Sequence, residues 1–207
     1  MSGADLRQVG PGFDHEATGS QAVFRAALQA LSHPGRWTPV PAAAHVPAAA
    51  HRAAALLMLA LLDAETSVWL SPGLRQAPVA AWLRFHTGCT LVDELARARF
   101  VWVAEGDDCP PLDQLAQGTD QDPDRSATCV LELGDARPGA QGVSWQLSGP
   151  GIQGARTLAA HGVPAGFESQ WQDNHARFPR GVDVFLVRRE AMAGLPRTTR
   201  LAALEEV

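Results

Sequence analysis

Apolar residues recur at helical spacing in several segments of the chain. In residues 20–31 they fall three and four positions apart, at Val23, Phe24, Ala27, Leu28 and Leu31. We expect Ser20 to cap this helix and Pro34-Gly35 to end it. Residues 51–62 are apolar on almost every side, which predicts a buried helix. The same periodicity predicts helices over residues 75–86, 112–117 and 167–178.

Short apolar runs bounded by turn residues predict strands. They cover residues 37–40, 67–70, 100–103, 127–133, 143–147 and 182–187, and another extended piece begins at Ile152. Strands alternate with helices through most of the chain, but two central strands follow each other directly. This order predicts a three-layer α/β/α sandwich with a mixed sheet. We expect a flexible N-terminal tail over residues 1–17 and one α/β domain over residues 18–207, whose ordered part closes at residues 196–200.

The composition is that of an ordinary globular protein, with 46% hydrophobic and 19% charged residues. The net charge of −5 and the lack of a basic block argue against a nucleic-acid surface. The longest apolar stretch is too short to cross a bilayer, and the N-terminus lacks the apolar core of a signal peptide. Three cysteines, an odd number, indicate reduced thiols. We therefore expect a cytoplasmic protein without a membrane contact.

All 17 residues counted as Lys or Arg are Arg. Without Lys the chain has neither the internal Schiff base of pyridoxal phosphate enzymes nor the lysine of a P-loop. The seven histidines show no metal-ligand spacing, and no serine-hydrolase elbow is present. We expect neither a cofactor nor a metal. Arginine forks remain well suited to phosphate-like groups.

Two short segments are candidates for anion binding. Arg84 and His86 fall at the end of a predicted helix, where the helix dipole alone also favours cations. Arg197, Thr198 and Thr199 combine a guanidinium with two hydroxyls, which suits phosphate or phosphonate oxygens. The second segment is equally typical of a subunit contact or a solvated loop.

Other motif residues point to structure rather than chemistry. Gly181 follows Pro179 where a helix gives way to a strand, and Asp183 needs a partner if it is buried there. Gly149 and Gly151 favour a tight turn over a phosphate-binding loop, because no helix is predicted after them.

These motifs, taken in order, resemble a known family. The segment from Phe24-Arg25 to Ser32-His33-Pro34-Gly35 is similar to the N-terminal region of the H subunit of bacterial carbon–phosphorus lyase. Further similar segments follow in the same order as in that family. They are Leu62-Asp63, Val68-Trp69-Leu70-Ser71, Leu83-Arg84-Phe85-His86-Thr87, Gly118-Thr119 with Pro123, Ser148-Gly149-Pro150-Gly151-Ile152, Phe178-Pro179 with Gly181 and Asp183, and Pro196-Arg197-Thr198-Thr199. His175 departs from the family pattern by lying three residues before Phe178.

The resemblance implies a fold like the large domain of pyridoxal-phosphate-dependent transferases, without the cofactor. It also implies a role in phosphonate catabolism, in which the G, H, I and L components form ribose 1-phosphonate 5-triphosphate from ATP and a phosphonate. The implied partners are the G, I and J subunits, with L as a functional partner, and a second copy of the chain when it is alone. No residue inherits a catalytic role.

Two hypotheses about function remain open. A structural or substrate-shaping subunit predicts exposed apolar surface for partners and no turnover alone. A free-standing phosphonate- or nucleotide-binding protein or enzyme predicts that Arg84, His86 and Arg197 converge in one pocket. A third reading, a lysine-less protein that still binds a pyridoxal-like ring, predicts a spectral change on titration with that cofactor.

Overall fold

A computed structural model describes residues 10–135 and 142–204. Its centre is a seven-stranded mixed sheet in the order β1-β9-β8-β5-β4-β2-β3. The strands are β1 (Thr38–Pro39), β2 (Ser67–Leu70), β3 (Thr90–Leu91), β4 (Phe100–Val103), β5 (Thr128–Glu132), β8 (Asp183–Val187) and β9 (Ala191–Leu195). From β3 to β8 neighbouring strands run parallel, whereas β9 is antiparallel to both of its neighbours. The expected mixed sheet is confirmed.

A second, three-stranded antiparallel sheet has the order β10-β6-β7. It consists of β6 (Gly142–Ser148), β7 (Arg156–His161) and β10 (Arg200–Ala203). The expected extended piece therefore begins at Arg156 and not at Ile152, which lies in the preceding turn. The ordered part also continues beyond residues 196–200, because Arg200 begins a strand that pairs with β6.

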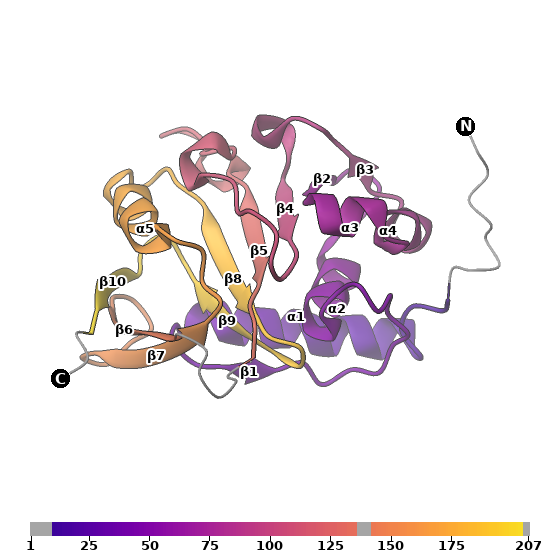
Figure 1. The fold of residues 1–207 in the computed structure, drawn as a ribbon, viewed down its shortest axis with the longest axis horizontal. Coiled ribbons are helices and arrows are strands. Elements are labelled where there is room, and N and C mark those ends of the chain that lie inside the picture. Colours follow the sequence, from indigo (N-terminus) through magenta and orange to yellow (C-terminus); the bar gives the residue numbers. More distant parts are fainter. Residues whose placement is uncertain (1–9, 136–141, 205–207) are drawn as a thin grey trace.

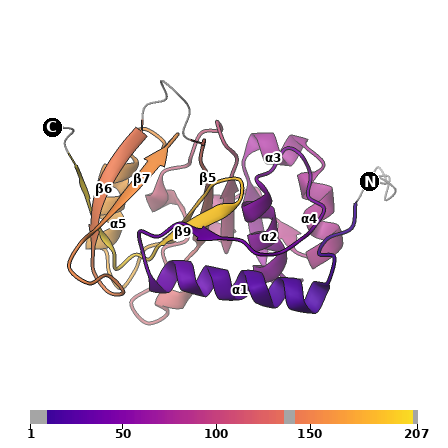
Figure 2. The same cartoon turned by 90° about the horizontal axis from the view of Figure 1, so that it is seen from below.

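The α-helices are α1 (Glu16–Ser32), α2 (Arg52–Leu61), α3 (Pro72–Gln76), α4 (Val79–Thr87) and α5 (Phe167–Ala176). Single 3₁₀ turns form η2 (Leu95–Arg97), η3 (Leu112–Gln114) and η4 (Pro123–Arg125). Figures 1 and 2 show α1 along one side of the main sheet, with α2 to α4 towards one end and α5 and the small sheet towards the other. Within the described residues no helix combines the length and the apolar character needed to cross a bilayer.

Both faces of the main sheet are buried, which explains the nearly continuous apolar runs in its central strands. On β5, Val130 belongs to the core formed with α1, α2 and α4. Its neighbours Cys129 and Leu131 belong to a second core, formed with α5 and the small sheet. The second outer layer is thus partly a β-sheet, and the expected three-layer α/β/α arrangement is modified on that side.

Several expected helix bounds are wrong. The first helix begins at Glu16, inside the expected tail, and His15 rather than Ser20 is its N-cap. The expected helix over residues 75–86 is divided into α3 and α4 at Pro78, whose ring is incompatible with a helix interior. The segment 112–117 forms only the 3₁₀ turn η3, and α5 ends at Ala176. Residues 1–9 of the expected tail lie outside the described residues.

Candidate functional site

Helix α5 separates two cavities near one end of the main sheet. Gln170, Asp173 and Arg177 recur at helical spacing and line the cavity on the side of η3. Trp171 and His175, one turn apart on another stripe, line the cavity on the side of β6 and β10. A single helix thus contributes different side chains to each cavity.

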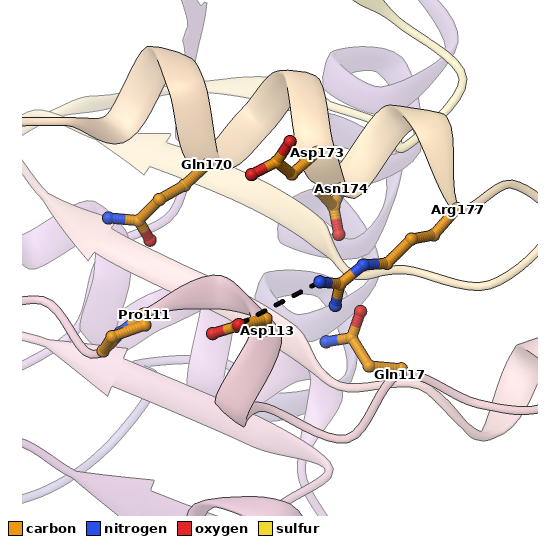
Figure 3. Close-up of a pocket in the computed structure, with 7 residues that line it drawn as sticks. All are labelled: Pro111, Asp113, Gln117, Gln170, Asp173, Asn174 and Arg177. Carbon is orange, nitrogen blue, oxygen red and sulfur yellow. Dashed lines mark ion pairs between the residues drawn. The ribbon is translucent and has the colours of Figure 1, made fainter.

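The cavity between η3 and α5 has a volume of about 220 Å³ (Figure 3), and it is lined by Pro111, Asp113, Gln117, Gln170, Asp173, Asn174 and Arg177. Its amides are partly committed to the backbone, since Gln170 Oε1 accepts from the Leu112 N–H at 2.9 Å and Gln117 Nε2 donates to the Leu112 carbonyl at 2.7 Å. Arg177 lies 4.0 Å from Asp113. With two carboxylates and one guanidinium, this cavity disfavours an anion.

The second cavity, which we call the α5–β10 cavity, has a volume of about 380 Å³, and it is lined by Gln146, Ser148, Trp171, Gln172, His175, Arg200, Leu201 and Ala202. Arg200 lies opposite Ser148 in the β10–β6 ladder, so both side chains occupy the same face of that sheet. His175 Nδ1 lies 2.8 Å from the Arg197 carbonyl oxygen, which can only accept. Nδ1 therefore carries hydrogen, and Nε2 is the ring nitrogen that remains available.

Arg197 is tied into the fold and is not free to bind a ligand. Its guanidinium donates to both carboxylate oxygens of Asp183, at 3.2 and 2.6 Å, and to Ser126 Oγ at 2.6 Å. It also donates to the carbonyls of Pro123 and Pro179, at 3.0 and 3.3 Å. The expected partner for Asp183 is thus found. All three guanidinium nitrogens have acceptors within the protein, so the side chain holds neighbouring segments of the fold together.

Thr198 and Thr199 follow Arg197 and also serve the fold. Thr199 is fully buried, and its carbonyl accepts from Trp171 Nε1 at 2.9 Å. Its hydroxyl is buried without a hydrogen-bond partner among the described residues. The carbonyl of Thr198 lies against Gly149, where an added Cβ would be only 2.9 Å away. The expected anion-binding role of these hydroxyls remains a prediction, because their placement fits a packed loop.

The glycine turns of the motifs pack closely against neighbouring backbone. Gly151 has φ +79°, and a Cβ there would lie 2.2 Å from the carbonyl oxygen of Ser32, two residues before Pro34. Gly35 has φ +80°, and Gly181 has φ +119°, where a Cβ would lie 2.9 Å from Asn174 Oδ1. These positions need glycine for conformation and for space. Motif segments far apart in sequence therefore meet in one cluster, in which Gly151 lies against Ser32 and Gly149 lies against Thr198, the residue after Arg197.

Arg84 and His86 occupy the end of α4, away from that cluster. His86 Nε2 lies 3.0 Å from the Gly10 carbonyl, and its ring has an edge-to-face contact with Trp82. His86 lines a cavity of about 400 Å³, together with Pro11, Gly12, Phe13, Glu16, Ser20, Leu59 and Phe85. Arg84 is exposed. The structure does not bring Arg84, His86 and Arg197 into one cavity.

A buried polar cluster at the carboxyl ends of β4 and β5 was not anticipated from the sequence. Glu132 is only 2% exposed and accepts from the His51 backbone N–H at 2.9 Å and from Trp102 Nε1 at 3.0 Å. His51 Nε2 in turn lies 2.9 Å from a carboxylate oxygen of Glu105. Burial raises the pKa of Glu132 above its usual value, and nearby His51 opposes this shift. An acidic residue at the end of an apolar strand was the signal that could have revealed the cluster.

The model of the PhnH family, described as bacterial phosphonate metabolism protein, matches residues 11–202. The chain belongs to the PhnH family. That match covers the main sheet, the helices α1 to α5 and the small sheet as far as residue 202.

Two relatives have similar lengths and names that point to assemblies. The alpha-D-ribose 1-methylphosphonate 5-triphosphate synthase subunit PhnH of Rhizobium meliloti (strain 1021) is 40% identical over 182 residues, covering 88% of this chain and 90% of the relative. The putative C-P lyase subunit protein HtxG of Stutzerimonas stutzeri is 31% identical over 190 residues, covering 90% and 87%. Both therefore align with this member of the PhnH family over nearly their whole length.

Proposed function

We propose that this chain is a subunit of a multi-protein synthase that forms ribose 1-methylphosphonate 5-triphosphate during phosphonate catabolism. The observation that carries this proposal is the nearly full-length match to a PhnH family relative that is named as a subunit of that synthase. Its companions are then the G, I and J subunits, of which J is the lyase that acts next, with L as a functional partner. Free cysteines at Cys89, Cys109 and Cys129 support a cytoplasmic location.

Exposed apolar side chains support a role inside an assembly. Large hydrophobic residues stand on the surface of α1, of α4 and of the loop after α5; they are Phe24, Leu28, Phe85 and Phe178, with exposures of 46, 49, 57 and 60%. Phe24 and Leu28 lie one and two turns along α1 from Ser20, which shares a cavity with Phe85. Exposed apolar side chains of this size are typical of protein–protein contact surfaces.

The fold supports a further part of the proposal. We infer that the main sheet is related to the large domain of pyridoxal-phosphate-dependent transferases. Support comes from the seven-stranded mixed sheet with both faces covered. In a chain without Lys, such a domain has no residue for the internal Schiff base, which favours a structural or substrate-shaping role. Superposition on solved transferases tests this kinship, and a different strand order there would refute it.

A deletion strain tests the proposed function. Cells that lack this chain should fail to grow on methylphosphonate as the sole phosphorus source while growing normally on inorganic phosphate. Growth on methylphosphonate without the chain would overturn the proposal. The purified companions should also co-purify with the chain, and conversion of a phosphonate and a nucleotide by the chain alone would contradict the subunit role.

A pair of variants tests the apolar surface. Leu28→Glu should weaken co-purification of the companion subunits, because it places a charge in the exposed apolar stripe of α1. Gln29→Glu adds the same charge at the next exposed position and should leave co-purification unchanged. Equal retention of partners by the two variants would exclude α1 from the contact.

A further inference from the structure

We propose that the α5–β10 cavity binds a phosphorus oxyanion that is carried by an apolar or planar carbon group. The proposal rests on the proposed function, since it names the class of substrate that the subunit would help to position. It places the site at Arg200 and His175, and not at Arg84, His86 or Arg197.

The charge of the cavity favours an anion. Its lining residues, all within the described part of the chain, include the guanidinium of Arg200, the imidazole of His175 and the hydroxyl of Ser148, but no carboxylate. The cavity across α5 has the opposite character, with Asp113 and Asp173 in its lining. One helix therefore separates a site that attracts an oxyanion from one that repels it.

Arg200 and His175 differ in how firmly they are held. Arg200 is exposed on β10 and has no ion-pair partner among the described residues, so both arms of its fork remain free for phosphorus-bound oxygens. The nearby Arg197, by contrast, donates the N–H groups of its guanidinium to Asp183 and to backbone carbonyls. His175 is oriented by the Arg197 carbonyl, which leaves its Nε2 to accept a hydrogen bond from the P–OH group of a monoprotonated phosphonate or phosphate.

The size and the apolar part of the lining exclude a bare anion as the best ligand. The volume of about 380 Å³ falls in the range typical of small-molecule sites, roughly 300–1,000 Å³. The apolar part of the lining consists of the exposed Ala202 and the buried Trp171 and Leu201, and inorganic phosphate would leave this part without an apolar partner. Two substrates of the proposed reaction share the required chemistry, an organophosphonate and an adenine nucleotide.

Titration of the full-length chain, followed by amide chemical shifts, tests the proposal. Phenylphosphonate, methylphosphonate, adenosine monophosphate and inorganic phosphate are the probes. Phenylphosphonate, adenosine monophosphate or both should give saturable shifts centred on residues 146–148, 171–175 and 200–202. These shifts should saturate at a lower probe concentration than any shifts caused by inorganic phosphate. A response to the nucleotide alone, or to the phosphonates alone, identifies the source. No saturable shift, or phosphate binding as tightly as both ring probes, overturns the proposal.

Matched variants locate the ligand. Arg200→Met should weaken binding at least tenfold, whereas Arg84→Met on the distant α4 should leave it unchanged. Gln172→Glu places a carboxylate in the lining and should also weaken binding, while Gln170→Glu adds the same charge on the other side of α5 and should not. Equal affinities within both pairs overturn the site. A chain that supports growth on methylphosphonate yet binds no probe refutes only this inference and leaves the proposed function standing.

Discussion

Replacing Arg197 by Met tests whether the hydrogen bonds of this side chain stabilise the fold. The substitution keeps an unbranched apolar stem but removes five hydrogen bonds from the guanidinium, of which two go to Asp183. The side chains are mostly buried, with exposures of 12% for Arg197 and 27% for Asp183. The variant therefore leaves a carboxylate in a partly desolvated position without its cation.

The expected cost follows from that loss. Breaking a buried ion pair by removing one partner typically costs about 3–5 kcal/mol. Asp183 keeps one donor, because the backbone N–H of residue 197 lies 2.8 Å from its Oδ1. We therefore expect the lower end, about 3 kcal/mol, in the free energy of unfolding. For a chain of this length that loss corresponds to a fall in Tm of roughly 6–12 °C.

Urea unfolding and thermal melts of the full chain measure this effect, with Arg200→Met as the control. Arg200 is exposed only three residues away, so its replacement should change the free energy of unfolding by less than about 0.5 kcal/mol. If Arg197→Met proves as stable as Arg200→Met, the hydrogen bonds described for Arg197 do not stabilise the fold. The guanidinium would then again be a candidate for ligand binding.

Four further substitutions test other features of the fold. Burial raises the pKa of Glu132, so the folded protein loses stability as pH rises above about 4.5, where the same carboxyl ionises freely in the unfolded chain. Glu132→Gln removes this ionisation. The urea midpoint of the variant should therefore fall less between about pH 4.5 and 7.5 than the midpoint of the parent. Gly151→Ala should lower the free energy of unfolding by more than about 2 kcal/mol, since its Cβ would meet the carbonyl of Ser32. Gly154→Ala, with a similar φ of +74° but open space, should cost only about 1 kcal/mol in the same melts. Thr199→Val should leave Tm unchanged or raise it, because the buried hydroxyl has no partner among the described residues, and a marked fall would show that the hydroxyl is bonded.

The parts of the fold set by local pattern were predictable. Strands β2 and β4 match their expected bounds, because short apolar runs there end at clear turn residues. Strand β9 was missed because its sequence, Ala-Met-Ala-Gly-Leu, has few residues with β propensity. The structure explains that composition, since a Cβ at Gly194 would lie 2.7 Å from the backbone of Ala30 in α1. Close packing by a helix, and not strand propensity, determines the sequence of β9.

The candidate site was less predictable because its contacts join distant segments. Arg197 suits an oxyanion by its neighbours in sequence, but Ser126 and Asp183 lie 71 and 14 residues away from it. His175 and Arg200 share a cavity only because α5 packs against β10. Helical spacing predicts which residues share one side of α5. It does not predict which of the two sides lines a cavity that contains carboxylates. Such pairings depend on the tertiary arrangement.

The position of Glu132 has a consequence for the whole main sheet. Open sheets with parallel strands usually receive ligands beyond the carboxyl ends of those strands, and a helix N-terminus there commonly holds an anion. In this chain the carboxylate of Glu132, at the end of β5, already accepts hydrogen bonds from the backbone N–H of His51, the N-cap of α2, and from the indole N–H of Trp102. An incoming phosphate would compete with a side chain that the fold supplies permanently. The sheet thus keeps the shape of a ligand-binding sheet, but the carboxylate of Glu132 occupies the position where an anionic ligand usually binds. Recognition of ligands or partners is then left to the outer surfaces of the fold.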